Sequence, residues 1–302
     1  MARYVVEPRG PFSLEEVRGF LAEFGPAAHA AEPLAGHLHV AVVPDGSDVA
    51  GGACVRAGDG TVTIDTFGAA DPDATRRQVE RMLSLDVDAR GFAAVAERDP
   101  VVGELRDRHP GWRPVSFTSP FEAGTWFLLS QRTRTPQAAA IKLRLRDELG
   151  EVVTVDGDER RAFPAPDRIA AVERFAGVPE RKWANVRALA HAALEGRLDG
   201  ERLRALPPEE AVADLQELPG VGPFTAQGIV LRGAGAPDLF APDEPRMAKA
   251  AALAYDLADE PSRDALAELA DTWRPFRSWV QMLLRIALAE RTDRDAAGEE
   301  RG

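Results

Sequence analysis

The chain has 302 residues, 45% of them hydrophobic, which is enough for two domains that bury a sizeable core. Its formal net charge of −12 argues against broad, nonspecific affinity for phosphate polymers or anionic lipid surfaces. Cys54 is the single cysteine, so we expect it to be a packing residue, and we expect no disulfide framework, cysteine-ligated zinc or four-cysteine iron–sulfur cluster. The first residues lack the layout of a signal peptide, and no apolar run approaches the roughly 20 residues of a membrane span, so we expect a cytoplasmic protein.

The first 75 residues have the pattern of a small antiparallel sheet. Short β-branched runs at 38–44, 51–58 and 61–68 are bounded by Gly, Asp and Pro. The segment 13–24 begins with a capping box, Ser13 followed by Glu16, and repeats apolar residues with the helical period. We therefore expect residues 1–75 to form a sheet with one helix packed on it.

From about Asp73 the hydrophobic period becomes that of helices. Amphipathic segments separated by Gly and Pro occupy 73–85, 166–177, 182–196, 208–218, 264–273 and 278–290. Residues 288–302 are highly charged and poor in apolar residues, so we expect a disordered tail. The predicted fold class is α+β, in which the small sheet-and-helix domain is followed by a mostly α-helical domain over residues 76–287.

Familiar catalytic and metal-binding motifs are missing from the sequence. His37 and His39 share one face of a predicted strand, but no acidic or cysteine partner lies at ligand spacing nearby, so we expect no metal site there. The chain has no G-x-G-x-x-G or Walker-type loop, and Ser130 and Ser278 lack the elbow motif of a nucleophile. Most dinucleotide-binding, P-loop and serine-hydrolase functions are therefore excluded.

The most informative stretch is a short apolar hairpin, LPGVG at 218–222, between two predicted helices. Gly220 and Gly222 permit positive φ and leave backbone N–H groups uncovered, and Pro223 suits the first turn of the next helix. Bare N–H groups at the positive end of a helix bind anions, and the anion repeated along a polymer is the phosphate of a nucleic acid. The alternative is a tight connection whose glycines serve only the turn.

The sequence LPGVGPFTA, residues 218–226, resembles the helix-hairpin-helix motif of DNA glycosylases. The nearest branch is the DNA-3-methyladenine glycosylase II (AlkA) type, and stretches at 81–88, 106–139, 192–198 and 273–284 support it. The resemblance covers residues from about 80 to 287 and implies a helix-hairpin-helix at 208–232. The small sheet-and-helix domain of such proteins is consistent with residues 1–75.

The resemblance also implies a catalytic carboxylate, because a fixed negative charge stabilises the cation that develops on the deoxyribose when the N-glycosidic bond breaks. The family's catalytic Asp aligns with Glu244, whose arm is one methylene longer, and a misplacement of about 1 Å can cost on the order of 100-fold in rate. Asp243 is either the alternative carboxylate or a helix N-cap for a segment that begins at Pro245. A third possibility is that neither acid acts.

Three residues are candidates for the base pocket. Phe224 stands where bifunctional relatives have the lysine of a Schiff base, which implies hydrolysis without AP-lyase activity; its ring would stack on the flipped base or pack in the core. Arg285 replaces an aromatic residue, so it would hydrogen-bond a base carbonyl or pair with Glu244, and its charge disfavours a cationic substrate. Trp279 is either a substitute ring or a core residue.

The resemblance assigns two further regions to DNA binding. Gln131 and Arg132 align with the loop that fills the gap left by a flipped nucleotide. This loop belongs to a basic segment that either faces the DNA or is a solvated helix face, and that comprises Arg132, Arg134, Lys142, Arg144 and Arg146. The hairpin contributes Leu218, Gly220, Val221, Gly222 and Thr225.

The family also implies a cation site at the hairpin. The carbonyls of Leu218 and Gly220 are the candidates to hold Na⁺ or K⁺, and no other cofactor is required. We therefore predict a monomeric, monofunctional DNA glycosylase of base excision repair that flips a damaged, alkylated purine out of duplex DNA. The alternatives are a noncatalytic DNA-damage-binding paralogue and a glycosylase for deaminated bases.

Overall fold

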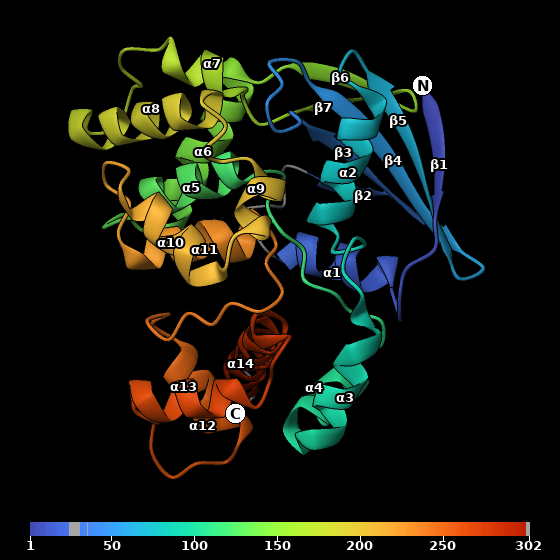
Figure 1. Ribbon diagram of the computed structural model, residues 1–302, viewed down its shortest axis with the longest axis vertical. Helices are drawn as coiled ribbons and strands as arrows, with labels where there is room; N and C mark the ends of the chain where they lie inside the picture. Colours follow the sequence, from blue (N-terminus) through green and yellow to red (C-terminus); the bar gives the residue numbers. More distant parts are fainter. Residues whose placement is uncertain (24–30, 35, 300–302) are drawn as a thin grey trace.

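The computed structural model of the chain describes residues 1–23, 31–34 and 36–299. As predicted, the fold is α+β, with a five-stranded antiparallel sheet beside a large set of helices (Figure 1). The strand order is β1-β5-β4-β3-β2. The strands are β1 (Ala2–Val6), β2 (Ala31–Leu34), β3 (His37–Val42), β4 (Gly51–Gly58) and β5 (Thr61–Gly68).

Two helices, and not the single one expected, cover one face of this sheet. They are α1 (Leu14–Glu23) and α2 (Pro72–Met82), whose apolar residues pack against Val40, Val55 and Ile64. The sequence pattern assigned α2 to the helical domain because its period is helical. Val79 and Met82 complete the core under the sheet, so the structural boundary lies after α2.

A hairpin from the helical part of the chain covers the other face of the sheet. It consists of β6 (Val152–Val155) and β7 (Asp158–Arg161), and it places Val153 and Val155 against Cys54. A Cβ on Gly52 would lie 2.3 Å from the Val155 side chain, so only glycine allows this close approach. This hairpin was not among the predicted elements, although VVTV followed by Asp-Gly is a recognisable hairpin signal.

The helices form two groups, at the side of the sheet and at the opposite end of the molecule (Figure 1). The first group comprises α5 (Pro120–Ser130), α6 (Thr135–Leu149), α7 (Pro166–Ala170), α8 (Glu180–Leu194), α9 (Gly200–Ala205), α10 (Pro208–Gln216) and α11 (Pro223–Arg232). The second comprises the 3₁₀ turn η1 (Ala89–Gly91), α3 (Phe92–Arg98), α4 (Pro100–Arg108), α12 (Met247–Ala254), α13 (Arg263–Asp271) and α14 (Arg277–Glu299).

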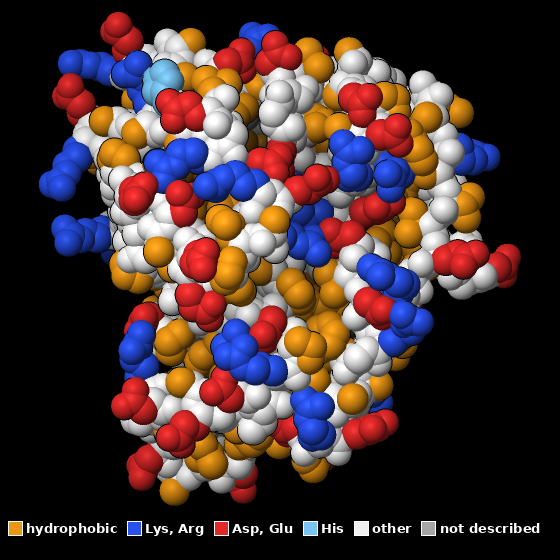
Figure 2. Space-filling view, in the orientation of Figure 1, with side chains coloured by type: hydrophobic (Ala, Val, Ile, Leu, Met, Phe, Trp, Pro, Cys, Tyr) orange, Lys and Arg blue, Asp and Glu red, His pale blue; other side chains and the backbone are white. Residues whose placement is uncertain are grey.

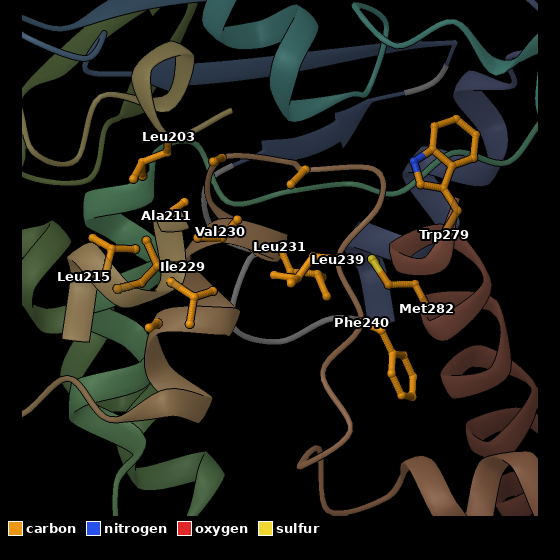
Figure 3. Packing of buried hydrophobic residues seen from close by; sticks show 14 of the residues in the cluster. Leu203, Ala211, Leu215, Ile229, Val230, Leu231, Leu239, Phe240, Trp279 and Met282 are labelled. Carbon is orange, nitrogen blue, oxygen red and sulfur yellow. The ribbon is translucent and has the colours of Figure 1, made fainter. Parts of the chain in front are cut away.

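One continuous hydrophobic core joins the two groups. Figure 3 shows Leu231 of α11 and Met282 of α14 with Leu239 of the connecting segment between them. That segment, 233–246, connects the end of α11 to the start of α12, and it contains Glu244. The core therefore fixes the position of this carboxylate relative to the helix-hairpin-helix.

The C-terminal tail differs from its prediction. Residues 288–299 continue α14 as a helix, and residues 300–302 of the predicted tail lie outside the described residues. Ala, Glu and Arg are strong helix formers, and extending an existing packed helix avoids the unfavourable nucleation step. Of the helices that the structure describes, none is long and apolar enough to cross a membrane.

Candidate active site and DNA interface

The hairpin between α10 and α11 has the tight geometry that its glycines suggested. Gly220 has a φ of +79°, and a Cβ there would lie 2.1 Å from the Asn185 amide nitrogen. Gly222 differs from the expectation of a positive φ: its φ is −89°, in the extended region, and its Cβ position is open. Leu218 and Val221 are buried, so their side chains anchor the hairpin and only their backbone is available to a ligand.

The first turn of α11 is left without a cap. Gly222 is the N-cap residue and supplies no side-chain hydrogen bond to the turn, and Pro223 at the first position has no N–H. The remaining first-turn amides therefore lie at the positive end of the helix dipole, beside the exposed Gly222, where an anion is stabilised. Thr225 is buried, and its hydroxyl accepts a hydrogen bond of 3.2 Å from the Gln131 side chain.

The loop after α5 is bound to this hairpin. Gln131 Nε2 also donates to the Gly220 carbonyl at 2.9 Å, so the two predicted DNA-contacting segments form one surface. Arg132 follows with a φ of +52° and an exposed side chain at the tip of the loop. This conformation is uncommon for a residue other than glycine and is maintained by the surrounding contacts.

Lys182 of α8, which was not among the predicted site residues, provides much of that support. Its Nζ donates to the carbonyls of Leu129 and Gln131, at 2.8 and 2.7 Å, and to Thr133 Oγ1 at 2.7 Å. Burial lowers the pKa of Lys182. Nothing in the amphipathic pattern of 182–196 distinguishes this lysine, because its partners are carbonyls of a loop about fifty residues earlier.

The carbonyls proposed for a monovalent cation already accept hydrogen bonds. The Leu218 carbonyl accepts the Val221 amide at 3.1 Å, and the Gly220 carbonyl accepts Gln131 Nε2. Each carbonyl oxygen has a second lone pair, which is the one that a cation would use.

The basic segment that follows is not a continuous DNA-facing rim. Lys142 is buried and forms an ion pair of 2.5 Å with Glu122, which lies on α5, before the segment begins at Arg132. Arg144 pairs with Glu148 and Arg146 pairs with Asp147, both of them acids in the next turn or next position of α6. On the face seen in Figure 2, basic and acidic side chains are likewise interspersed. Within this segment, Arg132 and Arg134 are the exposed cations.

Glu244 is held at both carboxylate oxygens. Oε1 forms an ion pair with Arg285 Nη1 of α14, and Oε2 accepts the Arg246 backbone N–H at 3.0 Å. Arg246 is the N-cap residue of α12, so the carboxylate also lies at the positive end of that helix. The side chain of Glu244 is 18% exposed, so part of it remains accessible.

Asp243 points elsewhere. Its carboxylate forms an exposed ion pair of 2.9 Å with Arg263 of α13. The predicted N-cap role is wrong, because α12 begins at Met247 and its N-cap is Arg246. Of the two adjacent acids, Glu244 is therefore the one that faces α14.

The surroundings of Glu244 are cationic. Arg285, the residue in place of an aromatic ring, makes the predicted ion pair with Glu244. Behind it lies Arg232 of α11, whose Nη2 donates to the Val115 carbonyl at 3.1 Å. Burial and the nearby charge of Arg285 lower the pKa of Arg232 to about 10. Arg285 thus stands between the Glu244 carboxylate and a second, buried guanidinium.

The two aromatic candidates have different fates. Phe224 is 41% exposed and packs edge-on against Phe127 with ring centroids 5.7 Å apart, so it is not a core residue. Trp279 is buried among Phe92, Trp112 and Phe276, so its predicted role in the base pocket is wrong. The inner face of α14 packs on α3 and α4, and Trp279 belongs to that face.

A helix-hairpin-helix with an uncapped second helix, followed by a partly buried carboxylate just before the next helix, is the arrangement expected of a helix-hairpin-helix DNA glycosylase. No family model matches the chain. DNA-3-methyladenine glycosylase 2 of Escherichia coli is 32% identical over 209 residues, which is 65% of this chain and 67% of that protein. The solved 3-methyladenine DNA-glycosylase of Archaeoglobus fulgidus has a TM-score of 0.76 at 20% identity and covers 93% of this chain and 96% of its own.

A third similarity is to the Clostridium acetobutylicum 8-oxoguanine glycosylase/lyase, solved with double-stranded DNA. Its TM-score is 0.66 at 17% identity, over 96% of this chain and 99% of that one. The chain belongs to the DNA-3-methyladenine glycosylase II (AlkA) family of helix-hairpin-helix DNA glycosylases. It is a base excision repair glycosylase.

Proposed function

We propose that this glycosylase hydrolyses the N-glycosidic bond of an alkylated purine flipped out of duplex DNA, with Glu244 as the catalytic carboxylate. The observation that supports it is the anchoring of both Glu244 oxygens, by Arg285 and by the Arg246 amide. The longer arm of Glu, compared with the family's Asp, is thereby restrained to one position. A restrained carboxylate stabilises the developing deoxyribose cation without reorganising, and it can orient the attacking water.

We propose hydrolysis without cleavage of the DNA backbone. A lyase step needs a lysine that forms a Schiff base, and the chain has three lysines. Lys142 is buried in its ion pair and Lys182 is bound to the loop after α5, while Lys249 lies on α12, after the carboxylate. Phe224 occupies the position where lyases have their lysine, and its exposed ring is available to stack on a flipped base.

We further propose that the hairpin between α10 and α11 and the loop after α5 bind the DNA duplex jointly. The first-turn amides of α11 would bind a backbone phosphate, and Arg132 would enter the gap left by the flipped nucleotide. A K⁺ or Na⁺ ion on the carbonyls of Leu218 and Gly220 would bridge to the same phosphate. The protein would act as a monomer in the compartment that holds the DNA.

A second candidate substrate is an uncharged lesion such as a deaminated purine. It is favoured by the guanidinium group of Arg285 beside the carboxylate, because that group repels a base that carries a positive charge. Arg285 can also donate hydrogen bonds to a base carbonyl, which hypoxanthine has and 3-methyladenine lacks.

The experiment is single-turnover release of free bases from two duplexes, one methylated and one containing hypoxanthine. Release of methylated purines that is lost in Glu244→Gln and kept in Asp243→Asn supports the proposal. Preferential release of hypoxanthine moves the substrate to the neutral class, and release by Glu244→Gln at the native rate excludes Glu244. Borohydride treatment during the reaction tests the lyase question, because a trapped covalent protein–DNA adduct contradicts simple hydrolysis.

A further inference from the structure

A group of metal-ligating side chains lies in the sheet, away from the glycosylase site. His37 and His39 are two residues apart on β3, so they point to the same face, and the antiparallel register places Cys54 of β4 directly opposite His39. The donor atoms of these three residues all lie within 4.8 Å of one another. We propose that His37, His39 and Cys54 bind one zinc ion.

The burial of this group indicates that it has a ligand. His39 is 1% exposed and Cys54 is fully buried. Neither ring nitrogen of His39 makes a hydrogen bond within the described part of the chain. A buried polar group without a partner costs about 1–3 kcal/mol, so native structures rarely leave one. A metal ion bound to Nε2 would satisfy this imidazole.

The other ring nitrogen of His39 faces an acid. Nδ1 lies 3.2 Å from the Asp158 carboxylate of β7, although not in good hydrogen-bond geometry. Metal-bound histidines commonly donate their second N–H to a carboxylate, which fixes the tautomer and makes the ring a better ligand. Asp158, whose carboxylate also accepts a hydrogen bond from Arg160 at 3.4 Å, is therefore placed to support His39 from behind.

The donor set suits zinc. Two imidazole nitrogens and one thiolate sulfur are ligands that Zn²⁺ prefers, and a water would complete a tetrahedron. Bond lengths of about 2.0–2.3 Å imply donor–donor distances of about 3.4–3.6 Å in such a site. The donors therefore need to approach by roughly 1 Å, which side-chain rotation on neighbouring strands provides.

The charges around the group are balanced for a cation. Arg56 and Arg160 are the nearby cations, and Arg56 is already engaged by Asp65 at 3.0 Å and by Asp156. Burial, followed by the charge of His37, lowers the pKa of His39, which favours the neutral, ligating form. Burial raises the pKa of Cys54 to about 11, so zinc binding has to displace the thiol proton to solvent, which opposes binding.

A zinc ion here would be structural. Cys54 and His39 lie under the β6–β7 hairpin, whose Val153 and Val155 pack on the same face of the sheet. The ion would therefore join β3 and β4 where the hairpin from the helical part of the chain covers them. This proposal departs from the expectation that a single cysteine excludes cysteine-ligated zinc, because strand pairing brings two histidines to the cysteine.

The test uses the full chain without a histidine tag, stripped with a chelator and dialysed. We expect calorimetry to show one Zn²⁺ per chain and Co²⁺ to give a thiolate-to-metal charge-transfer band. Zinc raises the unfolding temperature of the native protein, since a ligand that binds only the folded state stabilises it. Cys54→Ala removes the charge-transfer band and weakens binding by about 100-fold or more, beyond the 10–100-fold typical of outer-shell changes.

The matched control is His191→Asn, an exposed histidine on α8, which leaves zinc binding unchanged. If Cys54→Ala does not fold, His37→Asn at the partly exposed end of the group decides the question by the same affinity loss. Absence of a bound ion at micromolar zinc, or equal affinity in the native protein and the ligand variants, overturns the proposal. Uptake of Cu²⁺ without Zn²⁺ also overturns it as a zinc site.

Discussion

Removing the charge of Glu244 while keeping its shape is the sharpest perturbation of the proposed mechanism. Glu244→Gln retains an acceptor for the Arg246 amide but presents no negative charge to the sugar. At about 4 Å and an effective dielectric constant of about 20, two unit charges interact by about 4 kcal/mol. Since about 1.4 kcal/mol corresponds to a factor of ten, we expect release to slow by roughly 10³-fold, or about 10²-fold if only part of the charge has developed.

Arg285 has the opposite electrostatic effect on the rate measured in the same assay. A guanidinium about 7 Å from the sugar repels a full positive charge by about 2 kcal/mol under the same conditions, so it offsets roughly half of the carboxylate's effect. The assay is single-turnover base release with DNA affinity measured separately by anisotropy. If Glu244→Gln binds DNA normally and releases the base within about tenfold of the native rate, electrostatic stabilisation by this carboxylate is refuted.

The remaining predictions concern the hairpin, its supporting loop and the acid stability of α10. Gly220→Ala lowers the free energy of unfolding, measured by urea titration, by about 1–2 kcal/mol because residue 220 has a left-handed φ. Gly222→Ala leaves that free energy unchanged and weakens DNA binding. Equal losses of stability in the two variants would contradict the different roles of the two glycines. Lys182→Met frees the loop after α5, so trypsin cleaves after Arg132 faster than in the native protein, and an unchanged cleavage rate argues against the anchoring role. The pKa of Asp214 is lowered overall. Burial by itself would raise it, but the hydrogen bonds and charges of Arg202 and Arg197 together have the larger, opposite effect. This stabilisation is present above about pH 3.9 and is lost as the pH falls through the lowered pKa, so Asp214→Asn destabilises the protein at pH 7 but much less at low pH; a pH-independent difference would show another origin.

The elements that the sequence predicted are those whose signals are local. The helix-hairpin-helix, the antiparallel strands and the position of Glu244 follow from short motifs and spacing. The ion pair of Glu244 with Arg285 was also among the expected options, and the structure contains it. Local patterns succeed here because turn geometry and helical period depend on residues close together in the chain.

The misses share a non-local cause. The amphipathic pattern around Trp279 is the same whether its ring lines a pocket or packs in the core. Only the packing of α3 and α4 on α14 determines that it packs in the core. Lys142 belongs to a run of basic residues, but its partner Glu122 lies on α5, one helix earlier. Cys54 is fifteen residues from His39 along the chain, and only strand register makes them neighbours. Lys182 likewise acts on carbonyls, which no sequence pattern marks.

The hairpin that covers the sheet has a consequence for how the protein is made. The sheet is complete at Gly68, but the strands β6 and β7 that cover its second face end at Arg161. At a synthesis rate of about 5–20 residues per second, the ribosome needs roughly 5–20 s to add the intervening residues. During this interval no hairpin covers the face that carries Cys54, so a sheet formed at this stage exposes its apolar side chains to solvent and to other chains until the hairpin emerges.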